Sequence, residues 1–372
     1  MKSLLQFLHL FENSKLLTFQ QFIKDAQVRS TNRLVPLKQY MEQRNISQKD
    51  IRLLYEHIVN RNEYLERFYR TSLEVGSLKI TENPMPRSHL DNNTLVKYKN
   101  VIRHLHMRNI LQRTKSGLDN VPSFLDVLFD LYKKNIIDYK ILTPSAIHYI
   151  REGRIGSVFS SFYFRASIMN PYLVYSLNQS VLKGTRIFTP TLGWSSYAYG
   201  FAECPSVTEY VGVDVIDDVC NKTVDFMKNY PHINTRIYCT PSESLLANRH
   251  FMQTYREHFD TVFFSPPYYE LELYPGKQQS TTVYKSYEDW LNGYWLGTLK
   301  VCHHVLKKGG SMCYILSEGG GKDQTHILKD MNAITKTLFK LKHTLPMYNK
   351  NVFVTAGSHR DTSEKIMVFV KS

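Results

Sequence analysis

Cysteine is scarce in this sequence, and its few copies follow no recognisable pattern. The 372 residues include five cysteines, an odd number, and no two of them have the C-x-x-C spacing. Histidines do not accompany them in the pattern of a zinc site. These absences exclude a disulfide-stapled secreted domain. We expect free, buried thiols in a reducing compartment, cytoplasm or nucleus, and no bound metal.

Long apolar runs are missing too. No stretch reaches the roughly 18 apolar residues that a membrane-spanning helix needs. Residues 1–11 contain a short apolar run, but Gln6 and His9 interrupt it and no small-residue cleavage site follows. An amphipathic helix therefore fits this segment better than a signal peptide. We expect an intracellular protein with no membrane partner.

Positive charge and aromatic rings are abundant. The formal net charge is +14 and the isoelectric point is about 9.3, which favours a polyanionic partner such as nucleic acid. The basic excess is larger in the first 150 residues than in the rest. The 25 tyrosines and 20 phenylalanines can stack on bases, although most of them must form the core.

Residues 1–145 have the pattern of a helical region. Apolar residues recur at helical spacing over 51–76, and a loop rich in proline and asparagine follows at 77–93. Further helices are expected at 95–112 and 121–135. We expect this region to recognise the target or to bind nucleic acid; its helices would equally suit a homodimer or a partner protein.

The helix expected at 95–112, with the residues just after it, is densely basic. Side chains at this density can lie along a phosphate backbone, where they add affinity without reading the base sequence. A solvated helix face explains the same pattern equally well, and both interpretations stay open. The candidate nucleic-acid contacts are Lys97, Lys99, Arg103, Arg108 and Arg113.

From about residue 146 the pattern changes to alternating strands and helices, which is typical of an α/β domain. A strand at 185–188 leads into a turn at 189–196 that contains Gly193, and a helix follows. This arrangement is the form of a nucleotide-binding first turn, where the helix start presents N–H donors. Asp214 ends the next strand, 21 residues after Gly193, close to the ~20 expected of an acid that binds ribose hydroxyls.

The most informative stretch is Ser265-Pro266-Pro267-Tyr268. The aromatic and β-branched residues at 259–264 predict a buried strand, which two prolines must end. Open α/β sheets bind ligands at such strand ends. The Ser265 hydroxyl and the Pro266 carbonyl can accept hydrogen bonds from an exocyclic base amine, and a base rotated out of its helix can stack on Tyr268. Taken alone, a proline turn after an edge strand is the plainer interpretation.

Ser265-Pro266-Pro267-Tyr268 resembles the catalytic motif of the S-adenosylmethionine-dependent DNA amino-methyltransferases, and its serine is similar to that of N4-cytosine enzymes. The resemblance covers about residues 160–372. It implies a Rossmann-like class I methyltransferase with a mostly parallel seven-stranded sheet, S-adenosylmethionine as cofactor, and flipping of the target base. Gly193-Trp194 resembles a variant of the cofactor motif in some phage and viral methyltransferases. Thr189 stands where the family has an acidic residue, and a serine replaces its second glycine.

The resemblance also implies the roles of the site residues. The catalytic set is Ser265, Pro266, Pro267 and Tyr268. The expected cofactor contacts are Thr189, Pro190, Gly193, Trp194, Asp214 and Glu243. Glu243 would equally cap a helix, and Tyr269 is a further candidate nucleic-acid contact. Residues 270–284 are expected to form a flap over the substrate, and a hairpin with strands at 351–355 and 365–370 is expected to close the sheet.

The sequence therefore predicts two parts, a helical region at 1–145 and a methyltransferase domain at 146–372. The expected reaction transfers a methyl group to an exocyclic amine of DNA, cytosine N4 first, by direct attack without a covalent enzyme intermediate. Three alternatives remain: methylation of adenine N6 in DNA, methylation of RNA, and a degenerate protein that binds nucleic acid or a partner without catalysis. Thr189 and the missing second glycine motivate the last of these.

Overall fold

The chain forms two units that alternate along the sequence. The first contains Met1–Glu74 and Met107–Ala166, and the second contains Val75–His106 and Ser167–Ser372; we call them the helical unit and the sheet unit. This division differs from the single boundary expected near residue 145. The computed structural model describes residues 3–12, 17–31, 33–118, 121–317, 326–350 and 359–372.

The exchange of segments between the units has a physical cause in the core packing. In the 75–106 segment, the Tyr98 ring packs against Tyr172 and Tyr199, at centroid distances of 6.1 and 6.2 Å, which ties this segment to the sheet unit. In the 146–166 segment, the Phe159 ring packs against Phe124, 6.4 Å away, in the helical unit. Ring packing of this kind stabilises each unit separately.

The helical unit combines helices with a small sheet that the sequence did not predict. Strand β1 pairs with β2 in antiparallel and with β4 in parallel fashion. These strands have only three or four residues, too few for an alternating pattern to stand out among helices. The bounds are α1 Leu4–His9, α2 Phe19–Asp25, β1 Gln27–Ser30, β2 Arg33–Pro36, α3 Leu37–Arg44, α4 Gln48–Val59, α5 Arg61–Ser72, β3 Lys115–Ser116, α7 Phe124–Lys134, β4 Ile136–Asp138, α8 Pro144–Arg151 and α9 Ile155–Phe162.

Two helices expected from the sequence have different bounds in the structure. The one expected over 51–76 is two helices, α4 and α5, because the backbone of Asn60 leaves the helical region with ψ near 24°. The one expected over 95–112 is α6, Lys97–Leu105, in the sheet unit and a π-helical turn, Asn109–Arg113, in the helical unit. The helix expected at 121–135 corresponds to α7, which ends at Asn135 in the left-handed conformation.

The sheet unit contains a seven-stranded sheet in the order β11-β12-β10-β8-β5-β6-β7. The pairs β8–β10, β5–β8, β5–β6 and β6–β7 are parallel, and the pairs involving β12 are antiparallel. The mostly parallel seven-stranded α/β sheet expected from the sequence is thus confirmed. The bounds are β5 Arg186–Thr189, β6 Glu209–Asp214, β7 Asn234–Cys239, β8 Phe259–Phe264, β10 Leu306–Ser317, β11 Lys340–Lys350 and β12 His359–Val370.

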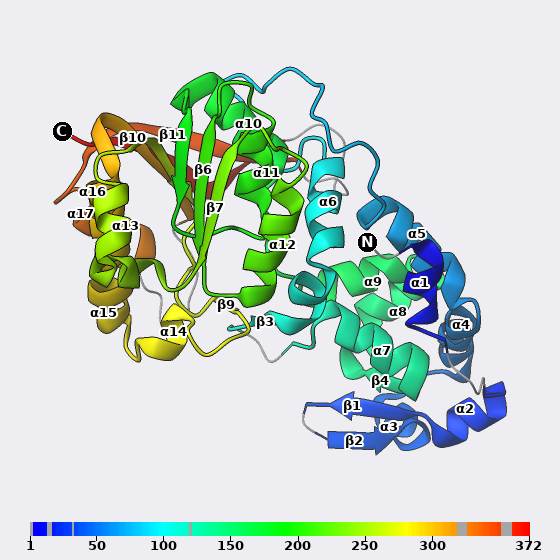
Figure 1. The fold of residues 1–372 in the computed structure, drawn as a ribbon. Coiled ribbons are helices and arrows are strands. Elements are labelled where there is room, and N and C mark those ends of the chain that lie inside the picture. Colours follow the sequence, from blue (N-terminus) through cyan, green and yellow to red (C-terminus); the bar gives the residue numbers. More distant parts are fainter. Residues whose placement is uncertain (1–2, 13–16, 32, 119–120, 318–325, 351–358) are drawn as a thin grey trace. The chain divides into compact units, whose positions relative to one another are not determined.

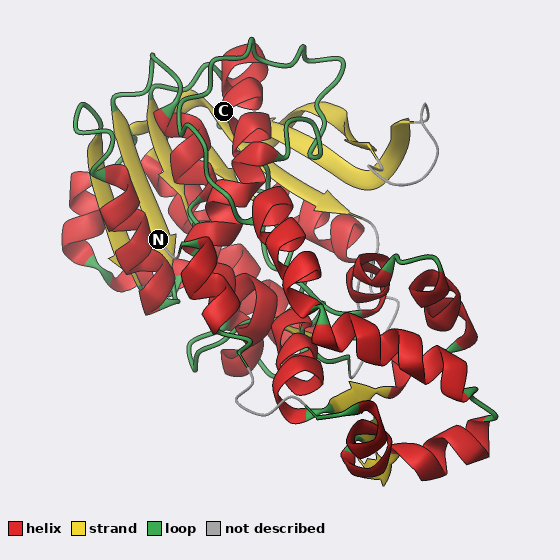
Figure 2. Ribbon diagram, turned by 90° about the vertical axis from the view of Figure 1, so that its right-hand side faces the viewer, coloured by secondary structure: helices red, strands yellow, loops and turns green. Residues whose placement is uncertain are grey.

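Helices cover both faces of this sheet (Figures 1 and 2). One layer is formed by α10, α11 and α12 and the other by α13, α16 and α17 (Figure 1). Because both faces are covered, the central strands contain runs of buried apolar residues, as in β8, where Val262, Phe263 and Phe264 have no exposed surface. The bounds are α10 Pro171–Leu177, α11 Ser196–Ala202, α12 Asp217–Met227, α13 Arg249–Thr254, β9 Glu272–Leu273, α14 Ser280–Val283, α15 Tyr287–Asp289, α16 Leu296–Val305 and α17 Ile327–Thr335.

An antiparallel hairpin of β11 and β12 closes the sheet. Its second strand contains the expected 365–370 segment, but its first strand is Lys340–Lys350. The strand expected at 351–355 lies outside the described residues. At the other end of the topology, the chain proceeds from β5 outward to β7 and then returns to β8 on the other side of β5. Ligands of open α/β sheets bind at such a reversal point, beyond the carboxyl ends of the strands.

Candidate functional site

A cavity lies at this reversal point, and residues that directly follow β5, β6, β7 and β8 line it. It brings together two segments distant in sequence, the glycine turn (190–195) and the proline loop (265–268). From the expected cofactor set, Pro190, Gly193, Trp194, Asp214 and Glu243 line the cavity. The whole expected catalytic set lines it as well: Ser265, Pro266, Pro267 and Tyr268.

Thr189 does not reach the cavity, contrary to the expectation from the sequence. It is the last residue of β5, its side chain is fully buried, and its Oγ1 lies 2.6 Å from the Tyr210 hydroxyl. Strand alternation explains this, because Thr189 points into the core. Pro190 and Thr191 line the cavity instead.

The glycine turn has an unusual backbone. Gly193, Trp194 and Ser195 follow each other in the left-handed region, with φ of 52°, 58° and 67°. A Cβ atom on Gly193 would lie 2.2 Å from the Tyr197 ring, so only glycine fits there. Each residue with a side chain in this region costs about 1–2 kcal/mol. The turn is therefore strained and needs support from its surroundings.

Asp214 presents a carboxylate to the cavity in a fixed orientation. Its Oδ1 accepts hydrogen bonds from the N–H groups of Val215 and Ile216, at 2.8 and 3.1 Å, and its Oδ2 accepts one from Leu192 N–H at 3.1 Å. Burial raises the pKa of Asp214, and these three N–H groups oppose that rise. The carboxylate can still accept further hydrogen bonds, since each oxygen has two lone pairs.

Glu243 follows β7 and does not act as a helix cap. The structure gives its Oε1 a hydrogen bond from the Tyr284 hydroxyl at 3.2 Å, and its side chain lines the cavity beside Thr240, Pro241 and Ser242. Burial raises the pKa of Glu243, while the bond from Tyr284 lowers it. The residue therefore belongs to the cavity wall.

The proline loop is held so that Ser265 can accept a hydrogen bond. Its hydroxyl donates its one proton to the Ile315 carbonyl at 3.1 Å, which leaves the oxygen lone pairs as acceptors. The Ser265 N–H donates to the Tyr197 hydroxyl oxygen at 3.0 Å, and this bond ties the loop to α11. Pro266 and Pro267 fix φ and provide no N–H group, so this stretch of backbone presents carbonyl acceptors only.

Tyr268 is hydrogen-bonded to a carboxylate whose role the sequence did not reveal. Its hydroxyl donates to Glu364 Oε1 at 3.2 Å, and Glu364, on β12, lines the same cavity. Burial raises the pKa of Glu364, while Tyr268 and the charge of Lys99 lower it. No local pattern identifies Glu364, because its place in the cavity depends on the pairing of β12 with β10, which sets Glu364 opposite Ser317.

Lys99 was expected on a phosphate-binding helix face, and the structure contradicts this. Its side chain is only 9% exposed, and its Nζ donates to Asn93 Oδ1 at 2.8 Å. Burial lowers the pKa of Lys99 to about 7, with Arg103 acting in the same direction and Glu364 and Asp91 opposing. Lys99 thus contributes charge near Glu364 inside the sheet unit.

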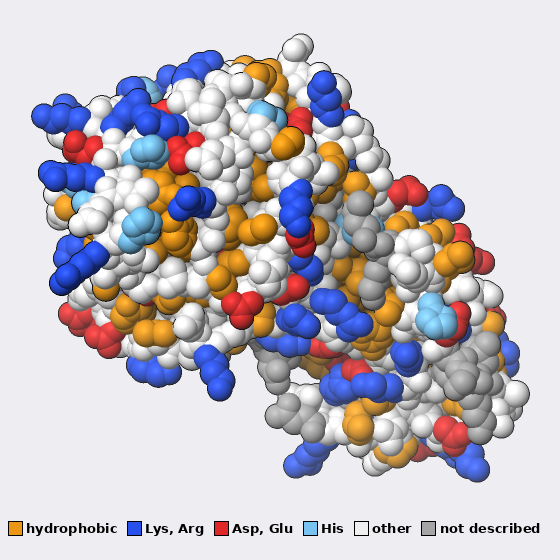
Figure 3. All heavy atoms as spheres, in the orientation of Figure 1, with side chains coloured by type: hydrophobic (Ala, Val, Ile, Leu, Met, Phe, Trp, Pro, Cys, Tyr) orange, Lys and Arg blue, Asp and Glu red, His pale blue; other side chains and the backbone are white. Residues whose placement is uncertain are grey.

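The other basic candidates do not form one helix face. Lys97 and Arg103 belong to the sheet unit, whereas Arg108 and Arg113 belong to the helical unit. Lys97 is exposed and paired with Glu82 at 2.6 Å, and Arg103 donates to Asn100. Arg108 donates to Gln112 and Arg113 to Asn109. The surface in Figure 3 shows Lys and Arg side chains spread over the visible face, with Asp and Glu among them.

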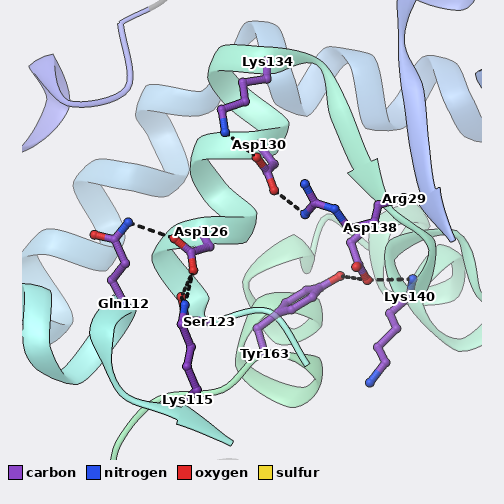
Figure 4. A network of polar contacts seen from close by, with 10 residues as sticks. All are labelled: Arg29, Gln112, Lys115, Ser123, Asp126, Asp130, Lys134, Asp138, Lys140 and Tyr163. Atoms are coloured by element: carbon purple, nitrogen blue, oxygen red, sulfur yellow. Dashed lines mark hydrogen bonds and ion pairs between the residues drawn. The ribbon is translucent and has the colours of Figure 1, made fainter. Parts of the chain in front are cut away.

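Several basic side chains of the helical unit are engaged by carboxylates on α7 (Figure 4). Asp126 accepts from Lys115 and Gln112, and Asp130 accepts from Arg29 and Lys134. The charges of Arg29, Lys115 and Lys134 are therefore neutralised locally.

Residues of the expected flap line the cavity, whereas Tyr269, expected to contact nucleic acid, does not line it. Tyr269 has a positive φ of 40°, and its ring packs against Tyr287 and Trp290 at 5.4 and 5.7 Å. In the 270–284 segment, Leu271, Glu272, Tyr274 and Gln278 to Ser280 line the cavity. The indole N–H of Trp290 donates to Ser280 Oγ at 3.0 Å, which fastens the segment.

No helix among the described residues is long and apolar enough to cross a membrane. In the same part of the chain, His, Cys, Asp and Glu side chains form no group of three that could hold a metal ion.

The sequence of the chain matches no known protein family. No family model matches the chain, and no curated protein matches it. Solved structures do match. TrmN from Thermus thermophilus is 13% identical with a TM-score of 0.35, and the match covers 55% of this chain and 49% of TrmN, about half its length.

Two other similar structures are methyltransferases. The N-methyltransferase NodS from Bradyrhizobium japonicum WM9, in complex with S-adenosyl-L-homocysteine, is 11% identical with a TM-score of 0.34, covering 54% of this chain and 83% of NodS. A methyltransferase from Pyrococcus furiosus is 14% identical with a TM-score of 0.34, covering 55% of this chain and 84% of its own.

Proposed function

We propose that the sheet unit binds S-adenosylmethionine and transfers its methyl group to an exocyclic amine of a nucleic-acid base, cytosine N4 of DNA first. The observation that carries this proposal is the shared cavity. It contains the glycine turn and Asp214 on one side and Ser265 to Tyr268 on the other. A methyl donor and an acceptor amine must meet in such a place to react in line.

The cofactor side of the cavity has the donors and acceptors that the cofactor requires. The Asp214 carboxylate, oriented by three backbone N–H groups, suits the two hydroxyls of a ribose. Trp194 and Ile216 provide apolar surface, and Thr240 to Glu243 provide polar groups for an adenine. When bound, S-adenosylmethionine supplies an electrophilic methyl group on its sulfonium.

The proline loop prepares the amine. The Ser265 hydroxyl, whose proton is engaged by Ile315, and the Pro266 carbonyl would accept hydrogen bonds from the amine and localise its lone pair toward the methyl group. Transfer forms the N–C bond and breaks the S–C bond, S-adenosylhomocysteine leaves, and the amine releases one proton to water. Tyr268, fixed at its hydroxyl by Glu364, provides a ring on which the flipped base stacks. Ser265 acts as a hydrogen-bond acceptor throughout and forms no covalent intermediate.

The proposal includes a nucleic-acid partner, for which the net charge of +14 and the stacking ring of Tyr268 are the support. The helical unit is proposed to recognise the target or to bind a partner protein. Two alternatives use the same cavity: methylation of adenine N6 in DNA and methylation of RNA. The non-catalytic alternative was based partly on Thr189, which stands where the family has an acidic residue. Thr189 lies against Tyr210 in the core and not at the cavity, so this part of the argument is weaker.

Product analysis tests this proposal. The purified full chain is incubated with radiolabelled S-adenosylmethionine and with DNA or RNA of the same sequence. The nucleic acid is then digested, and the labelled nucleosides are separated by chromatography and identified by mass spectrometry. We expect N4-methylcytosine from DNA in the wild type and none in Ser265→Ala/Tyr268→Ala. Asp225→Ala is the control and should retain activity, because Asp225 is an exposed residue on α12 that is paired with Lys228. Label in N6-methyladenine or in RNA would select one of the alternatives.

A further inference from the structure

Ser195 occupies a backbone conformation that its side chain should disfavour. It follows Gly193 and Trp194 in the left-handed region, with φ of 67°. Such conformations persist where the surroundings hold them in place. Trp194 is held through its ring, since its Nε1 donates to the Ser167 carbonyl at 3.1 Å. The Ser195 carbonyl accepts from Tyr199 N–H at 3.0 Å, and its hydroxyl is the side-chain group that can add support.

The Ser195 hydroxyl belongs to a buried chain of hydrogen bonds with a defined direction. On α12, the Thr223 hydroxyl donates to the Val219 carbonyl at 2.8 Å, so Thr223 Oγ1 accepts from Ser195, 2.7 Å away. Ser195 thereby uses its one proton and must accept from His106 Nε2, at 2.8 Å. His106 therefore carries its proton on Nε2.

The surroundings of His106 agree with this assignment. Its side chain is fully buried, and its Nδ1 has no hydrogen-bond partner in the described part of the chain, as expected of a bare ring nitrogen. Burial lowers the pKa of His106 to about 3; nearby Lys222 also lowers it, and Asp218 opposes. The ring stays neutral at physiological pH, and the direction of the chain does not change.

We propose that His106 and Thr223 are positioning residues for the cofactor turn. By holding the Ser195 hydroxyl, they maintain the left-handed backbone that a glycine would adopt without support. His106 ends the segment Val75–His106, so residues far before the cofactor motif complete its geometry. This inference rests on the proposed function, because the turn matters only if it binds S-adenosylmethionine.

Two substitutions at Ser195 distinguish the loss of its hydrogen bonds from the strain of its left-handed backbone. Ser195→Ala keeps the Cβ atom and loses both hydrogen bonds, and we expect the Kd for S-adenosylmethionine to rise roughly tenfold. Ser195→Gly also loses both bonds but adopts positive φ freely, and its Kd should stay within about threefold of the wild type. Equal Kd values for wild type and Ser195→Ala would overturn the inference.

Substitution of His106 tests whether it acts through Ser195. His106→Ala should raise the Kd roughly tenfold in the wild-type background and should have no effect in the Ser195→Gly background. His106→Gln retains an N–H donor near the Nε2 position and should restore much of the affinity. An equal loss in both backgrounds would show that His106 only fills space and would overturn the inference.

A spectroscopic measurement on the wild-type chain does not depend on any variant folding. The ¹⁵N shifts of His106 should report the Nε2–H tautomer, unchanged between pH 5 and 8. An Nδ1–H tautomer, or a titration in this range, would contradict the direction of the chain. Failure of the wild type to bind S-adenosylmethionine would overturn the proposed function, and the inference with it; binding that is insensitive to Ser195→Ala would overturn only the inference.

Discussion

The proline loop and the glycine turn meet in one cavity, but they are stabilised in different ways. The proline loop is stiffened by its own residues, Pro266 and Pro267, and by short contacts to the neighbouring β10 and α11. The glycine turn is strained and is held by His106 and Thr223, which come from other parts of the chain. Two neighbouring walls of a site can therefore be kept in place in different ways, one by prolines within the wall itself and the other by side chains that support a strained backbone.

The largest expected effect is at Tyr268, in the proline loop. Tyr268→Ala removes the stacking ring, and we expect the turnover number to fall at least about a hundredfold because the base is no longer positioned. Tyr268→Phe keeps the ring and loses only the bond to Glu364, so it should lose much less. Single-turnover rates and the Kd for DNA measure this; an equal loss of turnover and of DNA affinity in Tyr268→Ala would contradict the role.

Ser265→Ala should have the next largest effect. Removing one acceptor for the amine should lower the turnover number by roughly 10- to 100-fold while the Kd for S-adenosylmethionine stays unchanged. Steady-state kinetics and calorimetry on the same preparation provide both values. If the affinity for S-adenosylmethionine falls together with the turnover number, Ser265 also supports the cofactor side of the cavity, and the separate role of the proline loop is contradicted.

The buried Lys99 gives a prediction about pH. Its pKa is lowered to about 7 in the folded chain from an ordinary value of 10.5, so the unfolded chain binds more protons between these values. The free energy of unfolding of the wild type should therefore rise, relative to Lys99→Met, as the pH increases from about 7 toward 10.

Denaturant titration at several pH values measures this difference. Lys97→Met is the matched control, because Lys97 lies on the same helix with a side chain that is 58% exposed. The Lys97 variant should show no such rise. A pH-independent difference for Lys99→Met would mean that Lys99 remains charged and hydrated.

The smallest expected effect concerns the exposed basic residues. Arg113→Gln should weaken binding of nucleic acid only a few-fold and reduce the salt dependence by about one phosphate contact. Filter binding between low and moderate salt measures this. The same affinity and slope as the wild type would remove Arg113 from the interface.

The sequence revealed those parts of the site that depend on neighbours along the chain. Asp214 at a strand end and the two prolines after β8 follow from strand pattern and turn chemistry, and all of them line the cavity. The order of alternating strands and helices also predicted the parallel sheet. These features are local, so a single sequence contains enough information for them.

The features that the sequence did not reveal are tertiary. The burial of Lys99 depends on packing inside the sheet unit, and the role of Glu364 depends on pairing of β12 with β10. The sequence predicted Thr189 as a cofactor contact, but the alternation of side chains along β5 places it against Tyr210 in the core. The contact between His106 and Ser195 joins residues 89 positions apart, which no local pattern encodes.

The most direct test of the central claim is calorimetric titration of the purified chain with S-adenosylmethionine, with Asp214→Ala and Asp225→Ala as a pair. We predict saturable binding in the wild type and in Asp225→Ala, and loss of binding in Asp214→Ala, because Asp214 presents its carboxylate to the cavity whereas Asp225 is an exposed residue paired with Lys228. Absence of binding by the folded wild-type chain, with and without DNA, would contradict the account.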